Sequence, residues 1–264
     1  MTVDVSPITV LQLSDLHLFA DANQELLGLN TSQALDQVLE HVALTTDPDF
    51  ILLTGDLAQD ESEAAYIQIQ NKFSNFQIPI YAIPGNHDDP DLMAEFLSQS
   101  PFINARNFVA GGWRFILLDS SVNGQVQGSF SAQTLSRLAQ DLDDSQEPVM
   151  LVMHHPAYPV QSQWLDQIGL ENREDFWQVI DQFDQVKLVL CGHVHQDTPF
   201  ARNGVQYFST PSTCVQFEPH SENFVVGQQQ PGFRLLTLNG DGTFSSTVER
   251  VALSQSVNLQ ATGY

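Results

Sequence analysis

Apolar segments of strand length recur along this 264-residue chain, and longer amphipathic stretches separate them. The segments are largely continuous in apolar character and do not alternate, which is typical of strands buried on both faces. They cover residues 8–13, 50–53, 80–83, 115–118, 149–153 and 188–190. We therefore expect these segments to form the interior strands of a sheet, with a more polar segment after each.

The stretches between these segments repeat apolar residues at helical spacing. In residues 32–43, Leu35 and Val42 fall on one helical face. Ser131 is a suitable N-cap for a helix over residues 131–142. Further helices are expected over residues 61–73 and 173–183. Strands that alternate with helices predict an α/β protein with a mostly parallel central sheet.

The C-terminal part of the chain changes in character, because its apolar segments follow one another without helices between them. They cover residues 204–209, 233–238 and 244–252, and a turn-rich stretch at 239–242 joins the last two. This pattern predicts hairpin-linked antiparallel strands that complete a second sheet. No linker rich in Pro, Gly or Ser divides the chain, so we expect residues 1–264 to form a single domain.

Short polar motifs follow five of the apolar segments and contain six of the eight histidines. The motifs are Asp15-Leu16-His17, Gly55-Asp56, Gly85-Asn86-His87-Asp88, His154-His155-Pro156 and Gly192-His193-Val194-His195. Open α/β sheets place their ligand sites at the carboxyl ends of strands, where these motifs fall. Carboxylate, imidazole and amide donors without thiolate suit Fe, Mn, Zn or Co better than Ca or a structural zinc site. The motifs together predict metal-assisted hydrolysis.

The spacing within the motifs supports a shared site. Asp15 and His17 are two residues apart, as are His193 and His195, so on an extended backbone each pair points to one side. Glycines precede the candidate ligands at positions 55, 85 and 192. They allow sharp turns where a side chain would crowd the metals. Each motif alone is compatible with an ordinary turn or a buried histidine pair, but their joint occurrence favours a metal site.

The charge balance excludes some functions. Nine Lys and Arg residues stand against 32 Asp and Glu residues, a formal net charge of −23. A chain without a basic stripe is not expected to bind nucleic acid or an anionic membrane. The chain contains no apolar run of about 18 residues, so no transmembrane helix is expected. Of the two cysteines, Cys191 is expected to be a buried free thiol, and nothing suggests a disulfide framework with Cys214. With the absence of a secretory signal this predicts a cytoplasmic protein. We expect it to be a monomer or a homodimer.

The motifs resemble those of the calcineurin-like metallophosphoesterase superfamily, and the chain is most similar to its bacterial class III 3′,5′-cyclic-AMP phosphodiesterases. The resemblance extends beyond the motifs to residues 13–19, 54–60 and 210–217 and covers almost the whole chain. It implies a four-layer α/β/β/α sandwich of two mixed sheets. The metal site would lie at the carboxyl ends of the strands.

The resemblance also implies which residues hold two metal ions. One ion would be bound by Asp15, His17, Asp56 and His195. Asp56 would bridge to the second ion, which Asn86, His154 and His193 would also bind. Either histidine of the 154–155 pair fits the motif, and we assign His154 as the ligand with His155 behind it. His87 would be the catalytic general acid, and His17, Asn86, His87 and His195 would contact the substrate phosphate.

The implied reaction is the hydrolysis of 3′,5′-cyclic AMP to 5′-AMP. A hydroxide shared by the two ions would attack phosphorus, and His87 would protonate the departing ribose 3′-oxygen. The motifs hold metals and phosphate but do not select the leaving group, so glycerophosphodiesters, phosphoproteins and other cyclic nucleotides, including cyclic GMP, remain alternative substrates. A module that only binds would lack ligands or His87, and neither is missing. Candidate platforms for the base are Trp164, Phe217 and Phe224.

Overall fold

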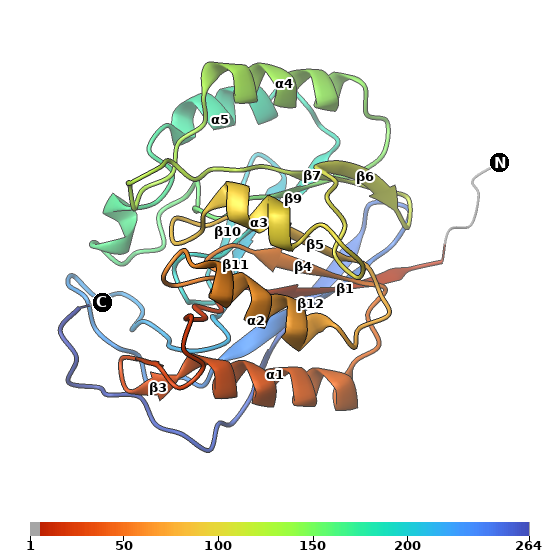
Figure 1. The fold of residues 1–264 in the computed structure, drawn as a ribbon. Coiled ribbons are helices and arrows are strands. Elements are labelled where there is room, and N and C mark those ends of the chain that lie inside the picture. The colour runs from red at the N-terminus through yellow and green to blue at the C-terminus, as the bar shows by residue number, and fades with distance from the viewer. Residues whose placement is uncertain (1–5, 264) are drawn as a thin grey trace.

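Two mixed β-sheets packed face to face form the centre of the computed structural model, which describes residues 6–263 (Figure 1). The first sheet has the strand order β13-β12-β1-β4-β5, and the second has the order β10-β11-β9-β8-β7-β6. The first comprises β1 (Ile8–Leu13), β4 (Phe50–Thr54), β5 (Ile80–Ile83), β12 (Gly232–Leu238) and β13 (Phe244–Arg250). The second comprises β6 (Asn107–Ala110), β7 (Trp113–Leu117), β8 (Val149–Val152), β9 (Val186–Cys191), β10 (Pro199–Arg202) and β11 (Val205–Ser209).

Parallel pairs form the middle of the second sheet and the β1-β4-β5 side of the first, while antiparallel pairs lie at the other margins. Strand β4 pairs in parallel with both β1 and β5, while β8 pairs in parallel with β7 and β9. The carboxyl ends of the strands that precede the polar motifs therefore meet at one edge of each sheet. A separate small hairpin joins β2 (Glu25–Leu26) and β3 (Leu29–Asn30).

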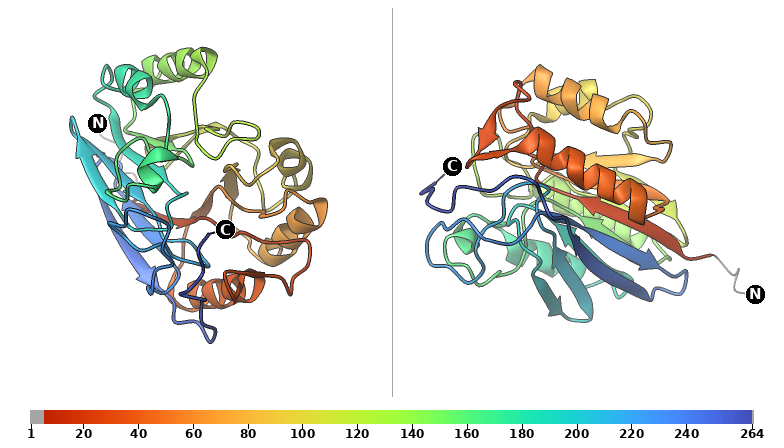
Figure 2. Two further views of the ribbon diagram at one scale, coloured as in Figure 1. Left: turned by 90° about the vertical axis from the view of Figure 1, so that its left-hand side faces the viewer. Right: turned by 90° about the horizontal axis from the view of Figure 1, so that it is seen from below.

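Helices cover the outer face of each sheet. They are α1 (Thr31–Thr45), α2 (Glu63–Phe73), α3 (Pro90–Phe96), α4 (Ala132–Asp143) and α5 (Arg173–Ile180), with a short 3-10 turn at Leu165–Gln167. Side chains cap the first four of them, because Asn30, Ser62, Asp89 and Ser131 accept hydrogen bonds from backbone N–H groups of the first turn. Figures 1 and 2 show α4 and α5 on one side of the molecule and α1 and α2 on the other.

Three apolar clusters define the layers. Leu11 of β1 packs outward with the helices of the first sheet, whereas its neighbour Val10 points inward between the two sheets. In β8, Leu151 packs outward with α4 and α5, whereas Met150 joins Val10 in the central cluster. Central strands such as β1 and β8 thus bury both faces, which is why their sequences are mainly apolar. The expected four-layer α/β/β/α sandwich is confirmed.

The expectation for the C-terminal strands is partly wrong. Strands β12 and β13 form the predicted hairpin but extend the first sheet, where β12 pairs antiparallel with β1. Strand β11 lies in the second sheet parallel to β9, and not in a hairpin with β12. Local patterns specify the hairpin turn but not the sheet edge on which a hairpin docks. Helix α3 and strands β6 and β10 were not predicted because they are short and weakly patterned.

Within residues 6–263, no helix is long and apolar enough to cross a membrane. The cytoplasmic location stays a prediction.

Candidate metal centre

The five polar motifs come together where strands of the two sheets end. The segments after β1 and β4 stay paired beyond the strands, because Asp15 N–H donates to the Gly55 carbonyl at 2.9 Å and His17 N–H to the Asp56 carbonyl at 3.0 Å. His193 N–H donates across the sandwich to the Asp15 carboxylate at 3.0 and 3.2 Å. Two backbone–backbone bonds and one pair of bonds to a side-chain carboxylate thus join the ends of three strands into one site.

The backbone of the motifs Asp15-Leu16-His17 and His193-Val194-His195 is not extended as expected. Asp15, His17, His193 and His195 have positive φ angles of 55°, 48°, 70° and 52°. The predicted extended backbone is therefore wrong, and each motif turns tightly through left-handed residues. Such conformations cost free energy for residues other than glycine and are concentrated at functional sites. The turns still bring the members of each pair towards the same centre.

Asp15, His17 and His195 form the first group of candidate ligands. Their ligand atoms lie within 4.8 Å of one another, and all three side chains are buried. The Nε2 atoms of His17 and His195 are 3.0 Å apart, and His195 Nε2 lies 3.3 Å from Asp15 Oδ1. His17 Nδ1 donates to Gln59 Oε1 at 2.5 Å, and His195 Nδ1 donates to the Val215 carbonyl at 2.7 Å. Because both partners are acceptors, Nε2 of each neutral ring presents a lone pair to the centre.

Asp56 links this group to a second one. Its Oδ2 lies 3.9 Å from His17 Nε2 and 3.2 Å from His154 Nε2. His154 Nδ1 donates to the Thr54 carbonyl at 2.7 Å, so its Nε2 is directed at the centre. Burial lowers the pKa of His154, but the Asp56 carboxylate outweighs this effect and raises the pKa to about 9. Asp15, Asp56 and His154 form another group of ligand atoms within 4.8 Å of one another. The position of Asp56 between both groups is the one that a bridging carboxylate requires.

Two further atoms that could bind a metal ion are buried without a hydrogen-bond partner among the described residues. These are Asn86 Oδ1 and His193 Nε2, and His154 Nε2 likewise lacks a hydrogen bond of acceptable geometry. A buried polar atom without a partner costs about 1–3 kcal/mol. Three such atoms beside two carboxylates fit metal ions. Histidines that bind metal ions usually donate their other ring N–H to an acceptor, which fixes the orientation of the ring. His17, His154 and His195 each have such an acceptor.

The protonation states agree with metal binding. Burial lowers the pKa of His17 to about 3 and that of His193 well below its usual value, so both rings are neutral at pH 7. Burial raises the pKa of Asp56, but the neighbouring charge of His154 outweighs this effect and brings the pKa well below its usual value. Neutral imidazoles and ionised carboxylates are the forms that bind transition ions, and a metal ion at His154 would displace the proton that the ring carries beside Asp56. The residues present therefore fit the group that the sequence predicts.

His155 has both ring nitrogens engaged away from this centre. Its Nδ1 accepts from the Ser120 hydroxyl at 2.8 Å, and its Nε2 donates to the Val126 carbonyl at 3.0 Å. Burial lowers the pKa of His155 to about 3, so the ring stays neutral. This geometry favours His154 as the ligand, with His155 packed behind His193 at a ring distance of 4.7 Å.

His87 is half-buried at the mouth of the site. Its backbone N–H donates to Asp56 Oδ1 at 2.9 Å, and its ring lies edge-on to that of His17 at 5.2 Å. Gln59 Nε2 donates to His87 Nδ1 at 3.4 Å. Gln59 therefore contacts both His17 and His87 through opposite ends of one amide. In the sequence, only its position three residues after Asp56 points to the site, and no local pattern indicates this double contact.

Asp88 joins the two loops that carry Asp56 and Asn86. Its buried carboxylate accepts hydrogen bonds from the backbone N–H groups of Leu57, Ala58 and Gly85 and from the Tyr66 hydroxyl. Burial, with the nearby charge of Asp56, raises the pKa of Asp88 to about 6. The motif residue that had no assigned role thus fixes the backbone on both sides of the site.

The glycines act for two different reasons. Gly55 has φ +93°, which supports the predicted sharp turn. Gly85 and Gly192 do not have positive φ; a Cβ atom would overlap with Asp56 Oδ1 at the first and with Ser14 Oγ at the second. At these two positions glycine is needed because another segment approaches closely.

The stretch 210–217 supports the centre from behind. The Ser212 hydroxyl donates to the Asp15 carbonyl at 2.7 Å, and the Phe217 ring stacks on His195 at 4.3 Å. Phe217 is only 2% exposed, so its face is not available to a nucleotide base. Trp164 and Phe224 pack edge-on against Phe217 and are half-buried. They remain candidates for a base platform.

The chain matches a known family and curated proteins over most of its length. Residues 8–197 match the family model of the calcineurin-like phosphoesterases. The chain is 39% identical to a 3′,5′-cyclic-nucleotide phosphodiesterase of Nostoc sp., with 97% of both chains covered. It is 40% identical to the 3′,5′-cyclic adenosine monophosphate phosphodiesterase CpdA of Haemophilus influenzae, with 97% of this chain and 95% of the other covered. The CpdA protein of Escherichia coli K12 is also 40% identical, with 93% and 90% covered.

Solved structures share the fold at low sequence identity. A dimetal phosphatase from Danio rerio superposes with a TM-score of 0.63 at 16% identity, covering 93% of this chain and 99% of the other. A purple acid phosphatase from yellow lupin has a TM-score of 0.65 at 14% identity, covering 93% and 52%. These similarities support the two-sheet architecture.

Proposed function

Because the chain belongs to the calcineurin-like phosphoesterase family, we propose that it hydrolyses 3′,5′-cyclic AMP to 5′-AMP at a centre of two metal ions. The observation that carries this proposal is the convergence of seven donor side chains from five strand ends on one buried site. The donors are Asp15, His17, Asp56, Asn86, His154, His193 and His195. The substrate follows from the relatives named as 3′,5′-cyclic AMP phosphodiesterases, which align with more than nine-tenths of this chain.

The two groups of donors would correspond to two ions. Asp15, His17 and His195 would hold the first, while His154, His193 and Asn86 would hold the second, and Asp56 would contact both. Nitrogen and oxygen donors of this kind suit Fe, Mn, Zn or Co. When bound, the ions supply a hydroxide nucleophile at neutral pH and offset the charge of the phosphate oxygens.

The protein contributes orientation and proton transfer. His87 lies at the open side of the centre, where its ring can reach the phosphate and donate a proton to the departing ribose 3′-oxygen. His87 would act as the acid in its protonated form, and Gln59 Nε2, 3.4 Å from His87 Nδ1, would help to orient the ring. Asn86, His17 and His195 would contact the phosphate from the metal side.

The test is a substrate panel on protein loaded with Mn²⁺ or Fe²⁺. We expect kcat/KM for 3′,5′-cyclic AMP to exceed the values for 3′,5′-cyclic GMP, 2′,3′-cyclic AMP and a glycerophosphodiester, with 5′-AMP as the product. Bis(p-nitrophenyl) phosphate serves as a check of metal loading, because its good leaving group makes it a permissive substrate. Faster turnover of the glycerophosphodiester would overturn the cyclic AMP assignment and leave the metal chemistry in place.

Two variants distinguish loss of a carboxylate at the proposed metal centre from loss of a carboxylate elsewhere on the protein. Asp56→Ala is expected to abolish hydrolysis, because it removes the carboxylate between the two groups of donors. Asp143→Ala removes an exposed carboxylate near the end of α4 and is expected to keep wild-type activity. Full activity of Asp56→Ala would contradict the proposed centre.

A further inference from the structure

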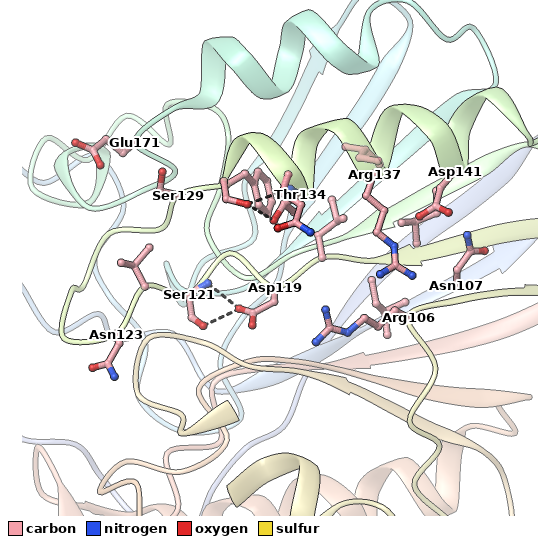
Figure 3. Close-up of a pocket in the computed structure, with 18 of the residues that line it drawn as sticks. Arg106, Asn107, Asp119, Ser121, Asn123, Ser129, Thr134, Arg137, Asp141 and Glu171 are labelled. Carbon is pink, nitrogen blue, oxygen red and sulfur yellow. Dashed lines mark hydrogen bonds between the residues drawn. The ribbon is translucent and has the colours of Figure 1, made fainter. Parts of the chain in front are cut away.

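A cavity of about 810 Å³ lies between helix α4 and the outer margin of the six-stranded sheet (Figure 3). Its walls comprise Leu138 of α4, Ile116 of β7 and the loop that runs from Asp119 to Phe130. Small-molecule sites commonly have volumes of about 300–1,000 Å³. The cavity is thus large enough for a ligand of nucleotide size.

Two arginine side chains point into this cavity from different elements. Arg106 directly precedes β6, and Arg137 lies in the middle of α4. Figure 3 shows that both guanidinium groups are directed into the space between the helix and the sheet margin. The arrangement brings two positive charges together in a chain with a net charge of −23.

These two arginines are exceptions among the nine basic side chains of the chain. Within residues 6–263, the other seven each form an ion pair or a hydrogen bond. They are Lys72, Arg114, Arg173, Lys187, Arg202, Arg234 and Arg250. Neither Arg106 nor Arg137 has such a partner in this part of the chain. The absence of ion pairs at these two arginines is not due to a lack of carboxylates, because the chain has 32 Asp and Glu residues.

The carboxylates that line the cavity do not neutralise the arginines. Asp119 Oδ1 accepts from the backbone N–H and the hydroxyl of Ser121 at 2.9 and 2.6 Å. Asp141 follows Arg137 by one helical turn, but the two form no ion pair in the described residues. Figure 3 shows Glu171 at the opposite end of the cavity from both arginines. The two guanidinium groups therefore keep their hydrogen-bonding capacity for a ligand.

We propose that this cavity binds a phosphorylated small molecule, with its phosphate held between Arg106 and Arg137. Guanidinium groups bind phosphate oxygens in bidentate fashion, and two of them match the charge of about −1.5 to −2 on a phosphate monoester at pH 7. The remaining lining suits the organic part of such a molecule. Amide and hydroxyl groups for a sugar come from Asn107, Asn123, Gln125, Ser129 and Thr134.

The proposed site is distinct from the metal centre. None of the seven candidate metal ligands lines the cavity, so the proposal does not rest on the proposed catalytic function. The two sites share one loop, because Ser120 hydrogen-bonds His155 Nδ1 and the Val126 carbonyl accepts from His155 Nε2. A ligand that contacts Ser121 or Gln125 would therefore bind beside the residues that hold His155.

The experiment is a calorimetric titration of the full-length, metal-loaded protein with inorganic phosphate, ribose 5-phosphate and 5′-AMP. The wild type is compared with the double variant Arg106→Gln/Arg137→Gln and with Arg173→Gln, an exposed arginine outside the cavity. Both cavity arginines are exposed and lack protein partners in the described residues, so we expect an unchanged melting temperature for the double variant. Any phosphate binding at the metals is common to the three proteins and cancels in the comparison.

We expect the double variant to bind ribose 5-phosphate and 5′-AMP at the cavity about tenfold more weakly or worse, since each lost contact is a hydrogen bond to a charged group. Arg173→Gln should bind as the wild type does. Identical affinity and stoichiometry in the double variant and the wild type would overturn the site. Equal affinity for inorganic phosphate and the two esters would overturn its assignment to an organic phosphate.

Discussion

The Nε2 atoms of His17 and His195 lie 3.0 Å apart, although the two residues are 178 positions apart in the sequence. Both rings use their Nδ1–H groups as donors on the far side, so in the neutral state two lone pairs face each other. Such a pair repels unless a cation lies beside it. Burial lowers the pKa of His17 to about 3, so this ring is neutral at pH 7, which is the form that binds a metal ion.

Metal analysis tests the bridging role of Asp56. Gently purified wild-type protein is expected to approach two transition ions per chain. Asp56→Ala should lose most of both, because its carboxylate lies 3.9 Å from His17 Nε2 and 3.2 Å from His154 Nε2. Elemental analysis by mass spectrometry measures the content, with Asp143→Ala as the control. Two retained ions in Asp56→Ala would rule out the bridge.

His87 is expected to serve the reaction without holding metal. His87→Ala should keep its metal content and lose about 10²- to 10⁴-fold in kcat on 3′,5′-cyclic AMP, the range typical of a general acid. The loss should be much smaller on a nitrophenyl diester, whose leaving group needs little protonation. Equal losses on both substrates, measured at the same metal content, would argue against proton donation by this ring.

Substitutions of Gln59 can separate an effect on metal binding from an effect on kcat, because its amide contacts His17 through the oxygen and His87 through the nitrogen. Gln59→Leu removes both contacts and is expected to weaken metal binding about 10- to 100-fold, as outer-shell substitutions do. Gln59→Glu keeps an acceptor for His17 and should retain metal, but it replaces the donor that faces His87 and should lower kcat. A chelator competition reads the first effect and steady-state kinetics reads the second. The assignment fails if both variants bind metal equally weakly.

The two thiols are expected to be inert in the folded protein. Cys191 and Cys214 are both 1% exposed, and burial raises the pKa of each to about 12. Since the thiolate is the reactive form, alkylation by iodoacetamide at pH 8 should be slow under native conditions. Two thiols should react at once after unfolding in guanidinium chloride, as mass spectrometry can count. Rapid native labelling of either residue would contradict its burial.

The candidate ligands could be predicted from the sequence, but the residues that contact and orient them could not. Asp15, Asp56 and His193 follow strands whose apolar character is local, so the strand ends are recognisable from the sequence. The contact of Gln59 with His17 spans 42 residues, and no local pattern indicates it. The same reason explains why Phe217 seemed accessible to a base, when its ring in fact packs on His195. Arg106 and Arg137 share a cavity only because α4 crosses the margin of the sheet.

Salt is expected to stabilise the protein, because a net charge of −23 on 264 residues makes the folded surface repel itself. Raising NaCl from about 0.1 M to about 1 M shortens the Debye length from about 10 Å to about 3 Å, which screens this repulsion. The melting temperature should therefore rise across that range with the metals kept saturated. KCl at the same ionic strength should act alike, because screening depends on ionic strength and not on the identity of the cation. A flat response in both salts would show that ion pairs such as Lys72–Asp36 and Arg114–Glu147 already compensate the surface charge.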